Sequence, residues 1–408
     1  MSVREAYLDN AATTRAFDSV TDVMVKVLAS DYGNPSSMHT KGMEAERFVK
    51  QAREEIAAAL KCEPRQIVFT SGGTESNNTA ISTAVRTLRH EGRHIVTTPF
   101  EHDSVSEPMK ALEKEGYEVT RVPVDACGIV DLQALREALR PDTVLVSVMY
   151  VNNEIGAVQP VAEIAKLVHE LAPKAMFHVD AIQAFGKYAI RPKKEGIDLL
   201  SASGHKIHGP KGVGFLYVAD PVRFKPLILG GGQQNGMRSG TENVPGIAGL
   251  AEAVRIMNAE GEACAERMRK IRDRFARGVR LIEGAQVNGP LARVLALRDD
   301  GADEDALRQA EAQAAPHIVS VSFEGVRAEV LLHALEERGV YCSSGSACST
   351  NHTARTHSRT LLAVGLRKDL LESTLRFSFG AFSAEEDAEY AAEQLAELVP
   401  FLRKFRRN

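Results

Sequence analysis

Apolar residues between about positions 18 and 250 follow two spacings that alternate along the chain. In residues 41–60, Phe48, Ala52 and Ile56 recur at the spacing of one helix face, which predicts an amphipathic helix. The next apolar run, 66–70, is short and rich in β-branched and aromatic residues, as is typical of a strand. The same patterns predict helices over 76–90, 104–115, 131–139 and 161–171, and strands over 94–98, 117–124, 143–151, 176–181, 197–203 and 212–218.

Strands that alternate with helices form a mostly parallel sheet with helices on both faces, so we expect an α/β fold. The pattern changes after about residue 250. One long amphipathic helix is predicted over 250–283, and the charged, Ala-rich residues 292–315 contain no strand pattern. Further on, strands are predicted over 318–323 and 374–380, and helices over 328–339 and 383–405. We therefore expect a large domain over 1–250, with residues 1–17 packing on a smaller α+β domain over 251–408.

Polar residues follow the predicted strands of the large domain where each strand ends. They form five sets: Thr70 to Thr74, Glu101 and His102, Asn152 to Glu154, Asp180 to Gln183, and Ser203 to Lys206. In parallel sheets, ligands bind beyond the carboxyl ends of the strands. The five sets therefore predict one shared site at that edge of the sheet.

Composition excludes several classes of protein. The 408 residues are enough for two or three domains, and the net charge of −4 with no Trp argues against direct nucleic-acid binding. No apolar run approaches the roughly 18–20 residues of a membrane helix, and the first residues lack the apolar core of a secretory signal. We therefore expect a cytoplasmic protein that does not insert into a membrane.

The cysteines point to a reactive thiol rather than to a disulfide framework. They number five, are widely spaced, and stand at Cys62, Cys127, Cys264, Cys342 and Cys348. This usage fits a reducing cytoplasm, and the usual zinc motifs are missing, so we predict no metal site. Cys348 lies among small polar residues in 341–350, which is typical of an exposed, reactive cysteine. We expect the other four to be structural.

Two motifs are candidates for holding an anionic cofactor with a carbonyl group. Residues 71–78 (SGGTESNN) lie between a strand and a helix, where glycines and free N–H groups favour an anion. The alternative is an ordinary turn with Ser71 or Thr74 as the N-cap. In SASGHKIHGPKG, Lys206 or its competitor Lys211 could form a Schiff base.

Three further residues have roles that fit the same cofactor class. Asp180 ends a buried strand and needs a partner, for which the protonated pyridine nitrogen of pyridoxal phosphate is one candidate and a helix cap is the alternative. Gln183, one turn further on, could donate to a ring oxygen. His102 could stack on an aromatic ring or move protons, although a lone histidine is often structural.

Taken in order, the motifs resemble those of the cysteine desulfurases, which are pyridoxal-phosphate enzymes, and the resemblance covers nearly the whole chain. They are YLDNAATT (7–14), GNPSSMH (33–39), SGGTESNN (71–78), EHDSV (101–105), VNNEIG (151–156), HVDAIQ (178–183), SGHKIHGPKGVG (203–214), RSGTENV (238–244), SSGSACS (343–349) and LRFSFG (375–380). The resemblance implies the fold-type I architecture, with a mostly parallel seven-stranded sheet between helices and a smaller α+β domain that carries the cysteine loop 342–360.

The resemblance also implies a role for each matching residue. Lys206 carries the cofactor, Asp180 pairs with its ring nitrogen, His102 stacks on the ring and moves protons, and Gln183 contacts the ring oxygen. The remaining cofactor contacts are Gly73, Thr74, Asn153, Ser203 and His205, with Thr241 reaching the phosphate of the other subunit of a homodimer. Asn34, Asn153 and Arg376 bind the substrate, and Cys348 is the nucleophile.

The implied activity is the conversion of L-cysteine to L-alanine, with the sulfur left as a persulfide on Cys348 for an acceptor such as an iron–sulfur scaffold protein. A selenocysteine lyase and a sulfur donor for tRNA thiolation are the alternatives within this fold. Two segments depart from the family pattern: residues 291–315 are longer, and the residues after Cys348 are rich in His and Arg. Both departures concern which protein accepts the sulfur, and neither involves the residues expected to bind the cofactor.

Overall fold

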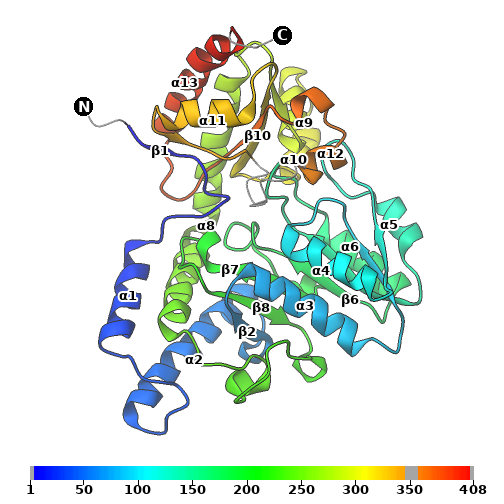
Figure 1. Cartoon of the computed structure of the whole chain (residues 1–408), viewed down its shortest axis with the longest axis vertical. Coiled ribbons are helices and arrows are strands. Elements are labelled where there is room, and N and C mark those ends of the chain that lie inside the picture. Colours follow the sequence, from blue (N-terminus) through cyan, green and yellow to red (C-terminus); the bar gives the residue numbers. More distant parts are fainter. Residues whose placement is uncertain (1–3, 345–356, 405–408) are drawn as a thin grey trace.

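A computed structural model describes residues 4–344 and 357–404, and a seven-stranded sheet forms its centre (Figure 1). The strand order is β2-β8-β7-β6-β5-β3-β4. β8 runs antiparallel to both of its neighbours, and the other neighbouring pairs are parallel. The strands are β2 (Ile67–Thr70), β3 (His94–Thr97), β4 (Glu118–Arg121), β5 (Thr143–Met149), β6 (Met176–Asp180), β7 (Leu199–Ser203) and β8 (Gly214–Val218). The predicted α/β class with a mostly parallel seven-stranded sheet is confirmed.

Helices cover this sheet, and every residue of β5, β6, β7 and β8 is buried. Burial on both faces explains why these strands are nearly continuous apolar runs. The helices of this part are α1 (Asp18–Ala29), α2 (Thr40–Leu60), α3 (Gly73–Thr87), α4 (Asp103–Lys114), α5 (Leu132–Ala138), α6 (Val161–Leu171) and α7 (Pro192–Glu195). α3 packs on β7 and β8, which places its first turn beside the carboxyl end of β7.

A second, antiparallel sheet lies in the remainder of the chain, in the order β12-β10-β9. Its strands are β9 (Ala285–Asn288), β10 (Ile318–Phe323) and β12 (Thr374–Ser378). The helices are α8 (Val244–Val279), α9 (Pro290–Asp299), α10 (Glu304–Ala312), α11 (Ala328–Glu336), α12 (Arg359–Ala363) and α13 (Glu385–Arg403). The long helix begins and ends earlier than the predicted 250–283. The predicted domain boundary between residues 250 and 251 falls inside α8, and the division into domains stays a prediction.

The Ala-rich residues 292–315 form two helices whose position is fixed by a buried arginine of α8. The Arg272 side chain is fully buried, and its Nη2 lies 2.8 Å from Glu311 Oε2. Its Nη1 donates to the carbonyls of Ala314 and Ala315, at 3.2 and 3.1 Å. A buried guanidinium requires partners of this kind, so this segment is held against α8 rather than forming a free loop.

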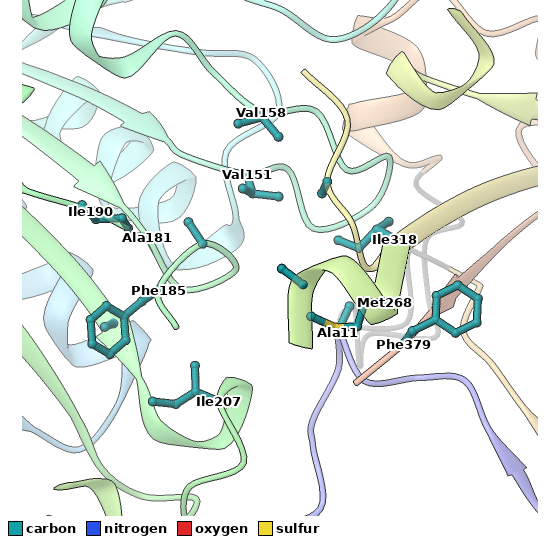
Figure 2. Close-up of a cluster of buried hydrophobic side chains, with 14 of the residues drawn as sticks. Ala11, Val151, Val158, Ala181, Phe185, Ile190, Ile207, Met268, Ile318 and Phe379 are labelled. Carbon is teal, nitrogen blue, oxygen red and sulfur yellow. The ribbon is translucent and has the colours of Figure 1, made fainter. Parts of the chain in front are cut away.

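One hydrophobic core connects the two sheets. The N-terminal strand β1 (Ala6–Tyr7) pairs in parallel with β11 (Val340–Tyr341), and Asp9 forms a bridge to Ser378 of β12, so the first residues lie beside the second sheet. Figure 2 shows part of the core, with side chains from the large sheet and its loops (Val151, Ala181, Phe185, Ile207) and from the rest of the chain (Ala11, Met268, Ile318, Phe379). Among the described helices, none is both long and apolar enough to span a membrane.

Candidate active site

A cavity of about 410 Å³ opens at the carboxyl ends of the parallel strands. Its volume falls within the roughly 300–1,000 Å³ typical of ligand pockets. The lining includes Lys206, His102, Asp180, Gln183, Gly73, Thr74, Asn153, Ser203, His205 and Arg376, all of them predicted site residues. Asn34 and Thr241 are exposed and do not line the cavity, and Cys348 lies outside the described residues. The structure thus brings together the residues predicted for the cofactor within one chain.

One end of the cavity is built from the start of α3 and the loop after β7. α3 begins at Gly73 with Gly72 at the N-cap position, so the alternative in which Ser71 or Thr74 is the cap is wrong. The first N–H groups of a 15-residue helix favour an anion here. Burial lowers the pKa of His205 to about 4, with Lys206 and Lys211 adding to the shift. His205 is therefore a neutral hydrogen-bonding group at neutral pH.

Lys206 closes the short helix that follows β7, and its amine points at the N-terminal segment. Nζ donates to the carbonyl of Ala11 at 2.5 Å and to that of Ala12 at 2.7 Å. Lys211, the competing lysine, is exposed and is not part of the lining. The structure therefore favours Lys206 over Lys211 as the amine that reacts in the cavity.

Asp180 presents a buried carboxyl group at the end of β6. Burial raises the pKa of this carboxyl, while the Ile182 N–H, the Asn77 amide and the positive charge of Lys206 act in the opposite direction. Oδ1 accepts from the Ile182 N–H at 3.0 Å, and Oδ2 accepts from Asn77 Nδ2 at 2.7 Å. A cation in the cavity would stabilise this carboxylate further.

Two residues that the sequence interpretation passed over connect Asp180 to His102. The Asn77 amide also donates to Ser104 Oγ at 2.9 Å, and Ser104 Oγ lies 2.8 Å from His102 Nδ1. His102 Nδ1 accepts from the Ser104 backbone N–H as well, at 3.1 Å. A neutral His102 therefore carries its proton on Nε2. Asn77 lies one helical turn after Gly73, and this spacing is the sequence feature that could have identified it as a site residue.

Gln183 is held in place by the N-terminal segment and by a buried histidine. Its Nε2 donates to the Ala11 carbonyl at 2.9 Å, and its Oε1 lies 3.3 Å from His317 Nε2. Because an amide oxygen can only accept, His317 must donate here. Burial lowers the pKa of His317 far below its ordinary value, so the ring is neutral. Gln183 keeps a second amide hydrogen for a ligand.

A buried arginine also lines the cavity. Arg376 Nη1 donates to the Asn153 carbonyl at 2.9 Å, and Nη2 lies 2.8 Å from Asp9 Oδ1. Arg376 Nε has no hydrogen-bond partner among the described residues. A guanidinium with free donor capacity in a pocket suits the carboxylate of a small ligand.

The sequence matches the aminotransferase class-V family over residues 6–298 and 300–390. The chain belongs to this family. Among its relatives, the putative cysteine desulfurase IscS 1 of Bacillus subtilis is 41% identical over 394 residues, 96% of this chain and 98% of the relative. The cysteine desulfurase IscS of Neisseria meningitidis is 41% identical over 98% of this chain and 93% of its own length. Within the class-V family the chain therefore belongs to the cysteine desulfurases.

Solved structures agree with this placement. A NifS-like protein matches with a TM-score of 0.87 and 36% identity, over 98% of this chain and 100% of that protein. A structure described as SspA in complex with cysteine matches with a TM-score of 0.75 and 34% identity, over 93% of this chain and 100% of that one. The resemblance to cysteine desulfurases is thereby confirmed, and members of this family depend on pyridoxal phosphate.

The residues of the class-V cavity fit pyridoxal phosphate. A Cβ at Gly73 would lie 2.2 Å from Ile182 Cδ1, so any larger residue there would have to displace the Ile182 side chain, which also lines the cavity. At that turn, Thr74, Ser203 and the neutral His205 offer hydrogen bonds to a phosphate. Asp180 supplies the buried carboxylate that a protonated pyridine nitrogen requires, and Lys206 supplies the amine.

The four described cysteines of this desulfurase are poor nucleophiles. Cys264 is buried and the other three are half-buried. Burial raises the pKa of Cys62 to about 12, and it also raises the pKa of Cys127, Cys264 and Cys342. Since the thiolate is the reactive form, these thiols are suited to packing. The role of Cys348 stays a prediction.

Glu101, next to His102, has a buried carboxyl group that keeps its proton to a higher pH in the folded protein than in the unfolded chain. Burial raises its pKa from 4.5 to about 8, although Thr98 Oγ1 and the Met149 N–H donate to Oε1. Oε2 has no partner among the described residues. The folded protein therefore binds one proton more than the unfolded chain between about pH 4.5 and about pH 8.

Glu101→Gln is expected to change how stability depends on pH. In the wild type the free energy of unfolding loses a contribution as pH rises through that window, and glutamine removes the titration. The variant should gain about 4 kcal/mol relative to the wild type between about pH 5 and about pH 9. Denaturant unfolding measures this, with the exposed Glu115→Gln as control. If the stability of Glu101→Gln and of the wild type changed with pH in parallel, the fold would not raise the pKa of Glu101.

Proposed function

We propose that the protein converts L-cysteine to L-alanine and retains the sulfur as a persulfide on Cys348. The observation that carries this proposal is the arrangement of one cavity. The amine of Lys206, the buried carboxyl of Asp180 and the guanidinium of Arg376 all line it. This arrangement suits an amino acid that reacts at its α-carbon while its carboxylate is held.

Each residue around the cofactor has a task in this proposal. When bound, pyridoxal phosphate supplies an aldehyde that condenses with amines and a ring that withdraws electrons from the substrate. Lys206 would hold the aldehyde carbon and, once L-cysteine has taken its place, would accept the α-proton. Asp180 would keep the ring nitrogen protonated, and His102, oriented by Ser104 and Asn77, would lie against the ring. Gln183 would donate to the ring oxygen.

At the substrate end, Arg376 holds the carboxylate and Asn153 lies beside it. Asp9 already occupies one edge of the guanidinium, at 2.8 Å from Nη2, and Nε is buried, so the substrate carboxylate is expected to use the remaining Nη hydrogens. Asp9 also fixes the plane of the guanidinium before substrate arrives. Asn34, which is exposed in this chain, assists only if a further element or subunit brings it to the cavity.

The sulfur step balances without an external oxidant. The Cys348 thiolate attacks the substrate sulfur, an S–S bond forms, and the bond between that sulfur and the substrate β-carbon breaks. The β-carbon keeps the electron pair and takes a proton, so L-cysteine and a thiol become L-alanine and a persulfide. The sulfur is oxidised and the β-carbon is reduced.

The same proposal includes a homodimer in the cytoplasm and a sulfur-acceptor protein. Thr241 is exposed and lies outside this chain's cavity, which fits a residue that reaches the phosphate of the other subunit. Relatives named IscS and the family resemblance support iron–sulfur cluster assembly as the destination of the sulfur. Transfer into tRNA thiolation and use of selenocysteine are the competing outcomes.

Mapping the sulfur tests the proposed activity. The cofactor-loaded protein is given L-cysteine, alanine is measured, and peptide mass analysis locates the added sulfur atom. We expect alanine together with one added sulfur on the peptide that contains Cys348. Alanine without any persulfide, or alanine formed only from selenocysteine, would contradict the proposal in favour of a lyase.

A further inference from the structure

Glu154, which is half-buried, links the loop that lines the cavity to the residues that follow the segment 345–356. Ser358 Oγ donates to Oε2 at 2.5 Å, and Thr360 Oγ1 donates to Oε1 at 3.1 Å. Asn152 Nδ2 lies 3.4 Å from Thr360 Oγ1, and its carbonyl oxygen accepts from the Glu154 N–H at 2.9 Å. Ser358 and Thr360 are both buried. One carboxylate thus joins the start of α12 to the loop that contains Asn153.

Arg359 joins the same residues to the other side of the cavity. Its Nη2 forms an ion pair with Asp103 and donates to the Glu101 carbonyl at 3.3 Å, while Nη1 lies 3.8 Å from Glu107. Asp103 follows His102 directly, at the first turn of α4. The ion pair between Arg359 and Asp103 is about half-exposed, so it contributes only modestly to stability. Its main effect is to fix where the Arg359 side chain lies.

The preceding end of the segment is fixed at the cavity too. Ser343 and Arg376 exchange two backbone hydrogen bonds, at 3.1 and 2.7 Å, and both residues line the cavity. Ser343 is therefore bonded to Arg376, which lines the cavity. Ser358 is bonded to Glu154, which directly follows the cavity residue Asn153. Between them the chain carries Cys348.

We propose that Glu154 and Arg359 are positioning residues that fix the C-terminal end of the Cys348-bearing segment against the loops that hold Asn153 and His102. This inference rests on the proposed function, because it assigns these residues to the transfer of sulfur to Cys348. Glu154 binds the hydroxyl groups of Ser358 and Thr360, and Arg359 sets the side facing α4. Arg359, one of the arginines after Cys348 that depart from the family pattern, thereby has a role within this chain.

These contacts predict that the binding of L-cysteine and the transfer of its sulfur can be affected separately. Neither Glu154 nor Arg359 lines the cavity, so cofactor and L-cysteine binding do not depend on them directly. Transfer of the sulfur requires Cys348 to reach the bound substrate in a narrow range of geometries, and loss of such positioning costs about 10–100-fold in rate. Their loss should therefore slow sulfur transfer and leave substrate affinity within about twofold of the wild type.

Three variants test this inference in the cofactor-loaded full chain. Thr360→Val keeps the buried shape and removes one donor to Glu154, Glu154→Gln replaces one acceptor oxygen, and Arg359→Gln removes the ion pair. Arg367→Gln is the matched control, since Arg367 pairs with Glu324 and Asp369 away from the cavity. Absorbance of the cofactor during L-cysteine titration reports substrate binding, and rapid quenching with mass analysis reports persulfide on Cys348 in a single turnover.

We expect single-turnover persulfide formation about 10–100-fold slower in the three variants, and an unchanged rate in Arg367→Gln. Wild-type rates in all three variants would overturn the inference, as would an equal loss of L-cysteine binding and persulfide formation. Should Glu154→Gln fail to fold, Arg359→Gln on the half-exposed surface decides the question. Absence of persulfide on Cys348 in the wild type would instead overturn the proposed function.

Discussion

Lys206→Ala is expected to lower alanine formation by about four orders of magnitude or more. The Lys206 amine is the group that holds the cofactor aldehyde and later takes the α-proton, so one substitution removes two functions. In the structure Nζ is oriented by the carbonyls of Ala11 and Ala12, and it lies in the same cavity as Asp180. No other lysine lines that cavity among the described residues.

Two comparisons separate this role from a general effect of charge. Lys211→Ala removes an exposed lysine from the same loop and should retain activity close to that of the wild type. Lys206→Arg keeps the charge but cannot form the Schiff base, so it should be as inactive as Lys206→Ala. Borohydride reduction of the loaded wild type, followed by peptide mapping, should place the cofactor on Lys206. A cofactor attached to Lys211 would refute the assignment.

The sheet and most of the cavity could be predicted because they depend on local patterns. The apolar runs at β5 and β6 are long and continuous, since both faces of these strands are buried. Parallel strands bring their carboxyl ends to one edge, so residues far apart in sequence, such as Gly73 and Lys206, had to meet there. Their meeting needed no knowledge of side-chain contacts.

The contacts that connect distant segments could not be predicted in the same way. Asp9 and Arg376 are 367 positions apart, and their pairing depends on β1 joining β11 and on the bridge between Asp9 and Ser378. A two-residue strand is too short for a periodic pattern to identify it. The path from His102 through Ser104 to Asn77 likewise depends on how α3 packs on α4.

A further limit of hydrophobic periodicity concerns charged residues that become buried when the chain folds. The helices α9 and α10 fall within residues that show no strand pattern, and they are stabilised by Arg272, a charged residue that a hydrophobic pattern places on the surface. Its burial is possible because Glu311, Asp273 and two backbone carbonyls satisfy the guanidinium. Such compensation is a property of the packed structure and not of any sequence window.

Cys348→Ser is expected to abolish persulfide formation and to lower alanine formation by about three orders of magnitude or more. A serine hydroxyl does not ionise near neutral pH and is a poor nucleophile toward sulfur, whereas a thiolate is a good one. Binding should survive, because the residues assigned to the cofactor and the substrate carboxylate line a cavity within the described chain. The absorbance change on addition of L-cysteine should therefore resemble that of the wild type.

Cys342→Ser is the matched control, because Cys342 is the neighbouring thiol, only six positions away in sequence. Burial raises the pKa of Cys342, and the Asp9 carboxylate adds to the shift, so this thiol has little thiolate at neutral pH. Its replacement should leave alanine formation within about twofold of the wild type, since a Cys→Ser change at a half-buried packing residue acts mainly on stability. If alanine formation instead survives in Cys348→Ser and is lost in Cys342→Ser, the nucleophile is Cys342. If it survives in both variants, sulfur is released without a protein thiol, and the reaction is that of a lyase.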